Sequence, residues 1–165
     1  MRFVLKEGLI QITVNQAITA RKFDGADHGL SHCMKAVDFI IELPDRYLFI
    51  ELKDPSDSPS AGLNSFLDKL KGNALDSELV YKYRDSFLYE QASGRAERPV
   101  HFLVLMALDV LDKAALMTRK RQLDRKLPLR GPQSGAWPQP IVASCGVFNL
   151  RSWNERFPEF PVERL

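Results

Sequence analysis

Two carboxylates and a lysine, Asp38, Glu51 and Lys53, are spaced so that a β-hairpin can bring them together. They lie in apolar segments, residues 35–42 and 47–53, which have the composition of β-strands and are joined by a short proline-containing turn. If the turn has four residues, the pairing places Asp38 opposite Glu51. Side chains alternate along a strand, so Lys53 shares their face. The sequence therefore predicts two acids and a cation on one side of a hairpin.

The register of this hairpin decides which side chains share a face. A four-residue loop pairs Glu42 with Tyr47, and a shift of one residue would move Asp38 away from Glu51. Ile40, Tyr47 and Phe49 then accompany the acids, so that their face is partly apolar. The opposite face is expected to be pure core, formed by Val37, Phe39, Ile41, Leu48, Ile50 and Leu52.

Opposed carboxylates favour a bound cation, because like charges directly across a strand pair destabilise it. Carboxylate oxygens are hard ligands that suit Mg²⁺, which one or two carboxylates and several waters can hold. An ammonium group beside such an ion, here Lys53, can orient a nucleophilic water or stabilise charge that develops on a phosphate. The three residues have the chemistry of a hydrolytic site.

The pattern resembles that of the PD-(D/E)XK phosphodiesterases, the restriction-endonuclease-like nucleases. It consists of Val37-Asp38, twelve intervening residues and Glu51-Leu52-Lys53, with valine in place of the motif's proline. The resemblance implies that Asp38, Glu51 and the backbone carbonyl of Leu52 bind Mg²⁺, for which Mn²⁺ can substitute. It implies that Lys53 positions or activates the attacking water. An additional acid is common on the family's first helix, and Glu7 is the candidate.

The family's core order is helix, three strands, helix, strand. Residues 5–23 fit one helical face, although Ile10, Ile12 and Val14 also alternate as in a strand; helix is the interpretation adopted. Residues 54–64, rich in serine and proline, predict a loop. The remaining pattern predicts helices at 76–93 and 112–126, strands at 100–108 and 141–150, a loop at 128–140 and a short aromatic tail.

This order indicates an α/β fold, with a central mixed β-sheet flanked by helices and a restriction-endonuclease-like core. The chain has 165 residues, 45% hydrophobic and 27% charged, which favours a single folded domain over residues 1–165. No apolar run reaches the roughly 20 residues of a membrane span, and the start lacks a signal-peptide pattern, so a cytoplasmic protein is expected. Cys33 and Cys145 belong to no zinc-binding pattern.

Basic residues concentrate in the predicted helix and loop 112–130. The segment 119–130 carries a charge of +5, whereas the rest of the chain carries −3. Such a concentration is typical of a phosphate-binding surface, although a solvated helix explains it equally well. The predicted nucleic-acid-binding residues are Arg119, Lys120, Arg121, Arg125, Lys126 and Arg130.

The leading functional hypothesis is a Mg²⁺-dependent nuclease that hydrolyses phosphodiester bonds, with DNA favoured over RNA as the substrate. A domain of this size often needs a second copy to cut both strands, so a homodimer is one expectation. The alternative is a catalytically inactive module that keeps the fold and binds nucleic acid or protein. Lys82 and Gln91, on the predicted helix 76–93, are weaker candidates for the site.

Overall fold

A mixed five-stranded sheet with strand order β3-β4-β5-β6-β7 forms the centre of the structure. The structure is a computed structural model that describes residues 1–57 and 60–165. β5 is antiparallel to β4 and parallel to β6. A smaller antiparallel sheet has the order β1-β2-β8. The strands are β1 (Phe3–Glu7), β2 (Ile10–Val14), β3 (Thr19–Lys22), β4 (Phe39–Glu42), β5 (Tyr47–Lys53), β6 (Val100–Met106), β7 (Ser144–Phe148) and β8 (Val162–Arg164), and the α-helices are α1 (Ser60–Lys71), α2 (Ala74–Ala92), α3 (Lys113–Asp124) and α4 (Leu150–Arg156). The α/β class and the mixed central sheet are confirmed.

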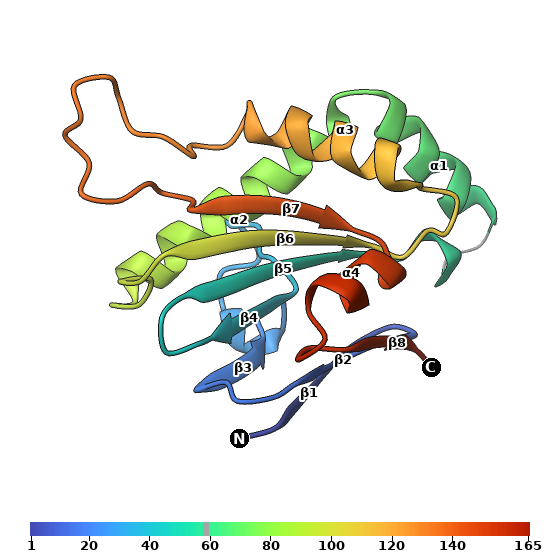
Figure 1. Cartoon of the computed structure of the whole chain (residues 1–165), viewed down its shortest axis with the longest axis horizontal. Helices are drawn as coiled ribbons and strands as arrows, with labels where there is room; N and C mark the ends of the chain where they lie inside the picture. Colours follow the sequence, from blue (N-terminus) through green and yellow to red (C-terminus); the bar gives the residue numbers. More distant parts are fainter. Residues whose placement is uncertain (58–59) are drawn as a thin grey trace.

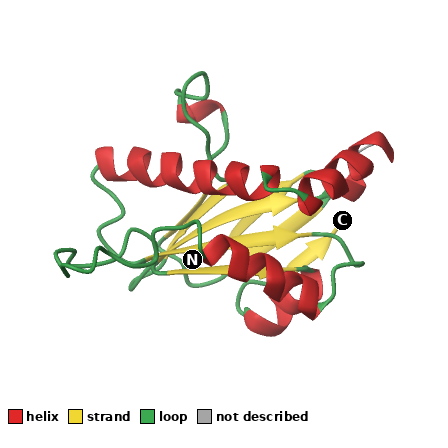
Figure 2. Ribbon diagram, turned by 90° about the horizontal axis from the view of Figure 1, so that it is seen from above, coloured by secondary structure: helices red, strands yellow, loops and turns green. Residues whose placement is uncertain are grey.

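The large sheet lies between two layers (Figure 1). Buried residues of α2 and α3 pack on one face, in a core that includes Phe49 and Phe102. α4 and the small sheet pack on the other face, against Ile50 and Leu105. Figure 2 shows α2, the longest helix, running along one side of the strands. β5 is therefore buried on both faces, as expected of a central strand with a parallel neighbour.

The β4–β5 hairpin has the register that the sequence predicts. Glu42 pairs with Tyr47 and Phe39 with Ile50, and the loop between the strands is closed by a bond from Leu43 N to Arg46 O of 2.9 Å. The division of faces also agrees with strand alternation: one face of the hairpin carries Ile40, Tyr47 and Phe49, and the other carries Phe39, Ile41, Leu48, Ile50 and Leu52.

Val37 does not follow this alternation, and its predicted place with Phe39 is wrong. It packs with Ile40 on the α2 side. The reason is that β4 begins only at Phe39: the Val37 N–H donates to Ser86 Oγ on α2, at 2.9 Å, and the Asp38 carbonyl accepts from Phe23 N at 2.8 Å. The chain before Phe39 is held by these contacts and does not continue the pleat.

The helix predicted over residues 5–23 is wrong, because this segment forms β1, β2 and β3. Gly8 has a φ of +54° in a two-residue turn, a conformation that hairpins favour and that ends β1 after Glu7. Ile10, Ile12 and Val14 are buried in alternation, whereas Ile18, which also fitted the helical face, is 47% exposed. The strand period of two residues, and not the helical period, describes this segment.

Two further expectations need correction. The stretch 54–64 is not all loop, because a 3₁₀ turn spans Pro55–Asp57 and α1 begins at Ser60; residues 58 and 59 lie outside the described residues. The later turns of α1 pack Phe66, Leu67 and Leu70 on the core, which stabilises the helix. The aromatic tail contains α4, which buries Trp153 and begins at a capping box formed by Asn149 and Ser152.

The other predicted elements are confirmed within a few residues by α2, β6, α3 and β7. The segment between α3 and β7 is a long loop that projects from one end of the molecule (Figure 1). Cys33 is exposed and Cys145 is buried, both as free thiols. Among the described helices, none combines the length and apolar composition needed to cross a membrane.

Candidate functional site

Asp38 lies at the point where β4 begins, beside the last residues of β5. Its Oδ2 accepts a hydrogen bond of 2.7 Å from the backbone N–H of Leu52. The Asp38 carboxyl group thus accepts the hydrogen bond that a backbone carbonyl of an adjacent strand would otherwise accept, and it is held next to Glu51. Burial, and then the negative charge of Glu51, raise the pKa of Asp38 from 3.8 to about 7, and Glu7 makes a smaller contribution in the same direction. Asp38 can therefore exchange a proton near neutral pH.

Glu51 is completely buried, and its two oxygens have different surroundings. Oε1 binds two ammonium groups, Lys82 Nζ at 2.7 Å and Lys53 Nζ at 3.0 Å. Oε2 has no hydrogen-bond partner within the described residues, although it is shielded from solvent. A buried carboxylate oxygen without a partner is costly, because nothing replaces the water that it loses.

Lys53 connects Glu51 to a second acid. Its Nζ lies 2.7 Å from Glu78 Oε1 on α2, and Lys69 of α1 lies 3.7 Å from the other oxygen of Glu78. Burial acts to lower the pKa of Lys53, but Glu51 and Glu78 outweigh it and raise the pKa above its ordinary value. Lys53 is therefore an ammonium ion at neutral pH, suited to orient water or stabilise anionic charge and unsuited to accept a proton.

Helix α2 supplies three polar residues at intervals of four, Glu78, Lys82 and Ser86, which lie on the side that faces the hairpin. Glu78 contacts Lys53, Lys82 contacts Glu51, and Ser86 accepts from the Val37 N–H. The sequence predictions included Lys82 only as a weak candidate and missed the other two. The signal that could have found them is this four-residue interval beside the apolar positions of the same helix.

The residues at this site meet some of the coordination requirements of a divalent cation. Glu51 Oε2 offers an unshared oxygen, and Asp38 is beside it. Lys53 O accepts from Ala107 N on the β6 side, so the N–H and C=O of Leu52 face the opposite edge, where Asp38 lies. Within the described residues no group of three or more His, Cys, Asp or Glu side chains converges on a metal-sized position, so an ion here would depend on two carboxylates, the Leu52 carbonyl and water.

Glu7, the predicted additional acid, lies at the end of a strand and not on a helix. It forms an ion pair with Lys22 of β3, a strand of the large sheet; Glu7 is half-buried and Lys22 is exposed. Its charge contributes to the raised pKa of Asp38, which indicates that it is close enough to influence the site electrostatically. Gln91, the other weak candidate, is exposed near the end of α2.

A cavity of about 240 Å³ opens beside the site, and Lys53 and Glu78 form part of its wall. The rest of the wall includes Lys69 and Phe66 of α1. Lys53 and Lys82 themselves are mostly covered, with 17% and 16% of their side chains exposed. A small anionic group could approach Lys53 through this cavity, whereas Glu51 does not line it and is shielded from solvent.

The basic segment divides into engaged and free residues. Arg119 and Lys126 bind the buried Asp76 of α2, at 2.7 and 2.9 Å, and Arg119 also bonds to the carbonyl of Leu70. Lys120 pairs with Asp124, one turn further along α3. These three cations therefore have internal partners. The cations exposed to solvent without an ion pair among the described residues are Arg121, Arg125 and Arg130.

Replacing Asp76 by asparagine is expected to lower the free energy of unfolding by about 2 kcal/mol. Breaking a buried ion pair leaves the remaining charges without compensation, and the partial exposure of Lys126 moderates the cost. The measurement is urea denaturation at neutral pH. Replacing the exposed Asp109 by asparagine is the control and should change stability little. A variant with wild-type stability would show that Asp76 does not hold α2 and α3 together.

No protein-family model matches the chain, and neither a curated protein nor a solved structure is significantly similar to it.

Proposed function

We propose that the protein is a metal-dependent phosphodiesterase of the PD-(D/E)XK type whose substrate is nucleic acid, with DNA favoured. One observation carries the proposal: Asp38 and Glu51 are buried side by side, with the pKa of Asp38 raised toward 7 and one oxygen of Glu51 left without a partner. Such an arrangement is unfavourable for stability alone and is typical of sites where function requires it.

The order of elements supports this family. β3, β4, β5, α2 and β6 come in the family's order of three strands, a helix and a strand, with one additional helix, α1, between β5 and α2. The hairpin β4–β5 carries the acids, and β6 is parallel to β5. The chain departs from the family in having the β1–β2 hairpin where the first helix is expected.

Each site residue has a role in this proposal. Asp38, Glu51 and the Leu52 carbonyl would hold Mg²⁺ or Mn²⁺, and the ion, when bound, supplies positive charge to the phosphate that is cleaved. Lys53, held between Glu51 and Glu78, would orient the attacking water and stabilise the developing negative charge. Lys82, bound to Oε1 of Glu51 at 2.7 Å, would hold this carboxylate in place.

The alternative, a catalytically inactive module, is supported by the same ion pairs. Lys53 and Lys82 both bind Glu51 Oε1, so the cluster is already compensated in part without a metal. The decisive experiment incubates the purified protein with single-stranded, double-stranded and branched DNA and with RNA, in Mg²⁺, in Mn²⁺ and in EDTA. Cleavage that requires the metal supports the nuclease. Absence of cleavage on every substrate, with binding unchanged in EDTA, supports the inactive module.

A separate prediction concerns the exposed cations of the basic segment. Reversing Arg121 and Arg125 to glutamate should weaken nucleic-acid binding for all sequences alike, because phosphate contacts carry little sequence information. Losing two phosphate contacts should reduce the slope of log K against log salt by about 1.8 for duplex DNA. Binding is measured by anisotropy in Ca²⁺ over a range of salt concentrations. The exposed Arg151 of α4, reversed in the same way, is the control, and an unchanged slope in the double variant would exclude this surface.

A further inference from the structure

Strand β7 ends the large sheet and pairs on one side only. Its partner is β6, and on its other side no strand lies next to it in the described part of the chain. Tyr47 N donates to Pro99 O and Lys53 O accepts from Ala107 N, so the odd-numbered residues of β6 face β5, whereas Phe102 and Val104 face β7. Phe102 is opposite Cys145, and in a parallel pair it bonds to the residues on either side of its partner. The N–H and C=O of Cys145 and Val147 therefore point away from β6. A free edge of this kind can accept another strand.

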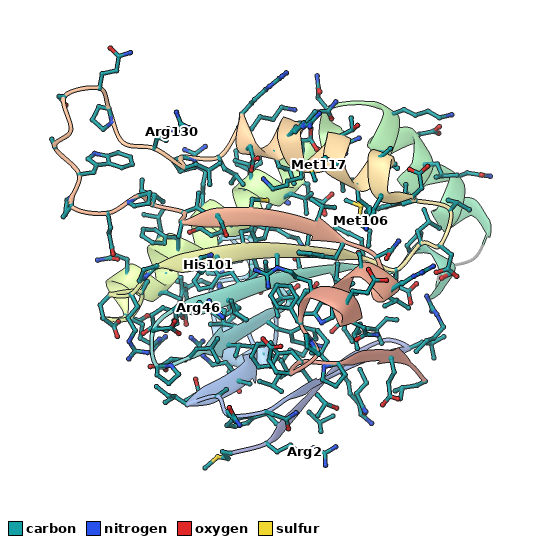
Figure 3. The ribbon with its side chains drawn as sticks, viewed as in Figure 1. Arg2, Arg46, His101, Met106, Met117 and Arg130 are labelled. Atoms are coloured by element: carbon teal, nitrogen blue, oxygen red, sulfur yellow. The ribbon has the colours of Figure 1, made fainter. Side chains whose placement is uncertain are left out.

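A groove of about 480 Å³ follows this edge. One wall comes from α3, with Leu116 and Met117, and the other from α4, with Phe157. Met117 is 48% exposed, so an apolar surface is open to solvent beside the free backbone. Figure 3 shows Met117 on α3 and His101 on β6, on opposite sides of β7. A strand added at this edge would thus lie between α3 and α4 and contact a partly apolar surface.

The charge of the groove is of one sign. Four cations line it, Arg46, Lys113, Lys120 and Arg156, and no acidic residue does. Lys113 and Arg156 form no ion pair within the described residues, and the Nε of Arg46 is shielded from solvent without a hydrogen-bond partner there. The groove is therefore complementary to negative charge.

We propose that this groove binds an acidic, extended peptide segment of a partner protein, which adds to the edge of β7 as a further strand. The free backbone supplies main-chain hydrogen bonds, the apolar walls accept alternate side chains, and the cations pair with the peptide's acidic residues. This proposal is independent of the phosphodiesterase site, because the groove and the acids belong to different parts of the sheet: β7 is separated from β5 by β6.

Charge argues against a second copy of this chain as the occupant. Pairing of β7 with β7 of another copy would bring Lys113 and Arg156 of one molecule toward the same cations of the other, and like charges at an interface are unfavourable. The free strand edge favours a peptide over nucleic acid, because phosphates need cations but do not need a row of alternating backbone donors and acceptors.

The test is the binding of a fluorescein-labelled peptide of about seven residues that alternates aspartate with valine, followed by anisotropy. Replacing Cys145 by proline removes one outward N–H without removing a bond to β6, and is expected to weaken binding about tenfold. Cys145→Ala is the matched control, because it keeps the N–H and loses only the buried thiol.

A second variant tests the charge and does not alter the strand. Reversing Lys113 and Arg156 to glutamate together is expected to weaken binding of the acidic peptide at least about tenfold and to permit binding of the peptide in which lysine replaces aspartate. Thermal unfolding checks that each variant is folded. The exposed Arg125, which does not line the groove, is reversed as the control.

Four results would overturn the proposal. The first is equal binding of the acidic and basic peptides to the wild type. The second is an acidic peptide whose affinity is unchanged in the charge-reversed variant. The third is displacement of the peptide by a thymidine oligonucleotide, because nucleic acid would then be the occupant. The fourth is a concentration-dependent dimer in sedimentation that Cys145→Pro abolishes, because a second copy would then be the occupant.

Discussion

Replacing Glu51 by glutamine is expected to reduce Mg²⁺-dependent cleavage of nucleic acid about a thousandfold. An amide keeps the shape of the carboxylate but cannot supply the negative charge that a divalent cation requires, and Lys53 loses one of its two acids. The measurement is the single-turnover rate on the substrate that the wild type cleaves best. The fold of the variant is checked by circular dichroism.

Glu42→Gln is the matched control, because Glu42 is on the same hairpin but at its far end, where it pairs with Arg98 at 3.1 Å. We expect it to retain most of the activity. If Glu51→Gln retains wild-type cleavage, or if Glu42→Gln loses as much, the acids opposite each other on the hairpin are not the catalytic pair.

The second large expected effect is a dependence of the free energy of unfolding on pH, in the absence of metal. The pKa of Asp38 is about 7 in the folded protein and near 3.8 when the chain is unfolded, so the folded state holds the proton more tightly. Between these values the folded state binds more protons, and the free energy of unfolding falls as the pH rises. The total loss for this group is up to about 4 kcal/mol between about pH 4 and pH 8, since each pKa unit corresponds to about 1.4 kcal/mol.

Asp38→Asn should remove this dependence, because asparagine does not ionise and its oxygen can still accept from the Leu52 N–H. The variant is therefore expected to gain stability relative to the wild type as the pH rises. Urea denaturation in EDTA at several pH values measures the difference.

Asp54→Asn provides a control of the opposite sign. Burial acts to raise the pKa of Asp54, but Arg164 and Ser56 outweigh it and lower the pKa, so its carboxylate stabilises the fold above its unfolded pKa. That variant should lose stability relative to the wild type as the pH rises through the acidic range. A constant difference between Asp38→Asn and the wild type at all pH values would show that Asp38 ionises normally.

The hairpin that carries the candidate site was predictable from the sequence, because its determinants are local. Side chains alternate with a period of two, and the four-residue loop sets the register, so Glu42 opposite Tyr47 followed from residues 35–53 alone. Helix α2, in which Leu79, Val80 and Tyr83 are buried at helical spacing, and the apolar strand β6 were found for similar reasons. In each case a repeated pattern extends over enough residues to exclude the other period.

Packing decided what the local pattern left ambiguous. Residues 5–23 contain both a helical and a strand period, and the positive φ of Gly8 together with the burial of Ile10, Ile12 and Val14 against the core makes them strands. Val37 departs from alternation because Ser86 of α2, 49 residues away in sequence, takes its N–H. Contacts at such separation leave no periodic signal.

The state of the site's charges was likewise decided by the tertiary structure alone. The sequence placed Asp38, Glu51 and Lys53 together, but burial is what raises the pKa of Asp38, and α2 brings Lys82 to Glu51. In the basic segment, the net charge is a property of the sequence, whereas the availability of each cation depends on whether an acid folds against it. Asp76 engages Arg119 and Lys126 in this way, because a carboxylate without exposure to water requires cations as partners.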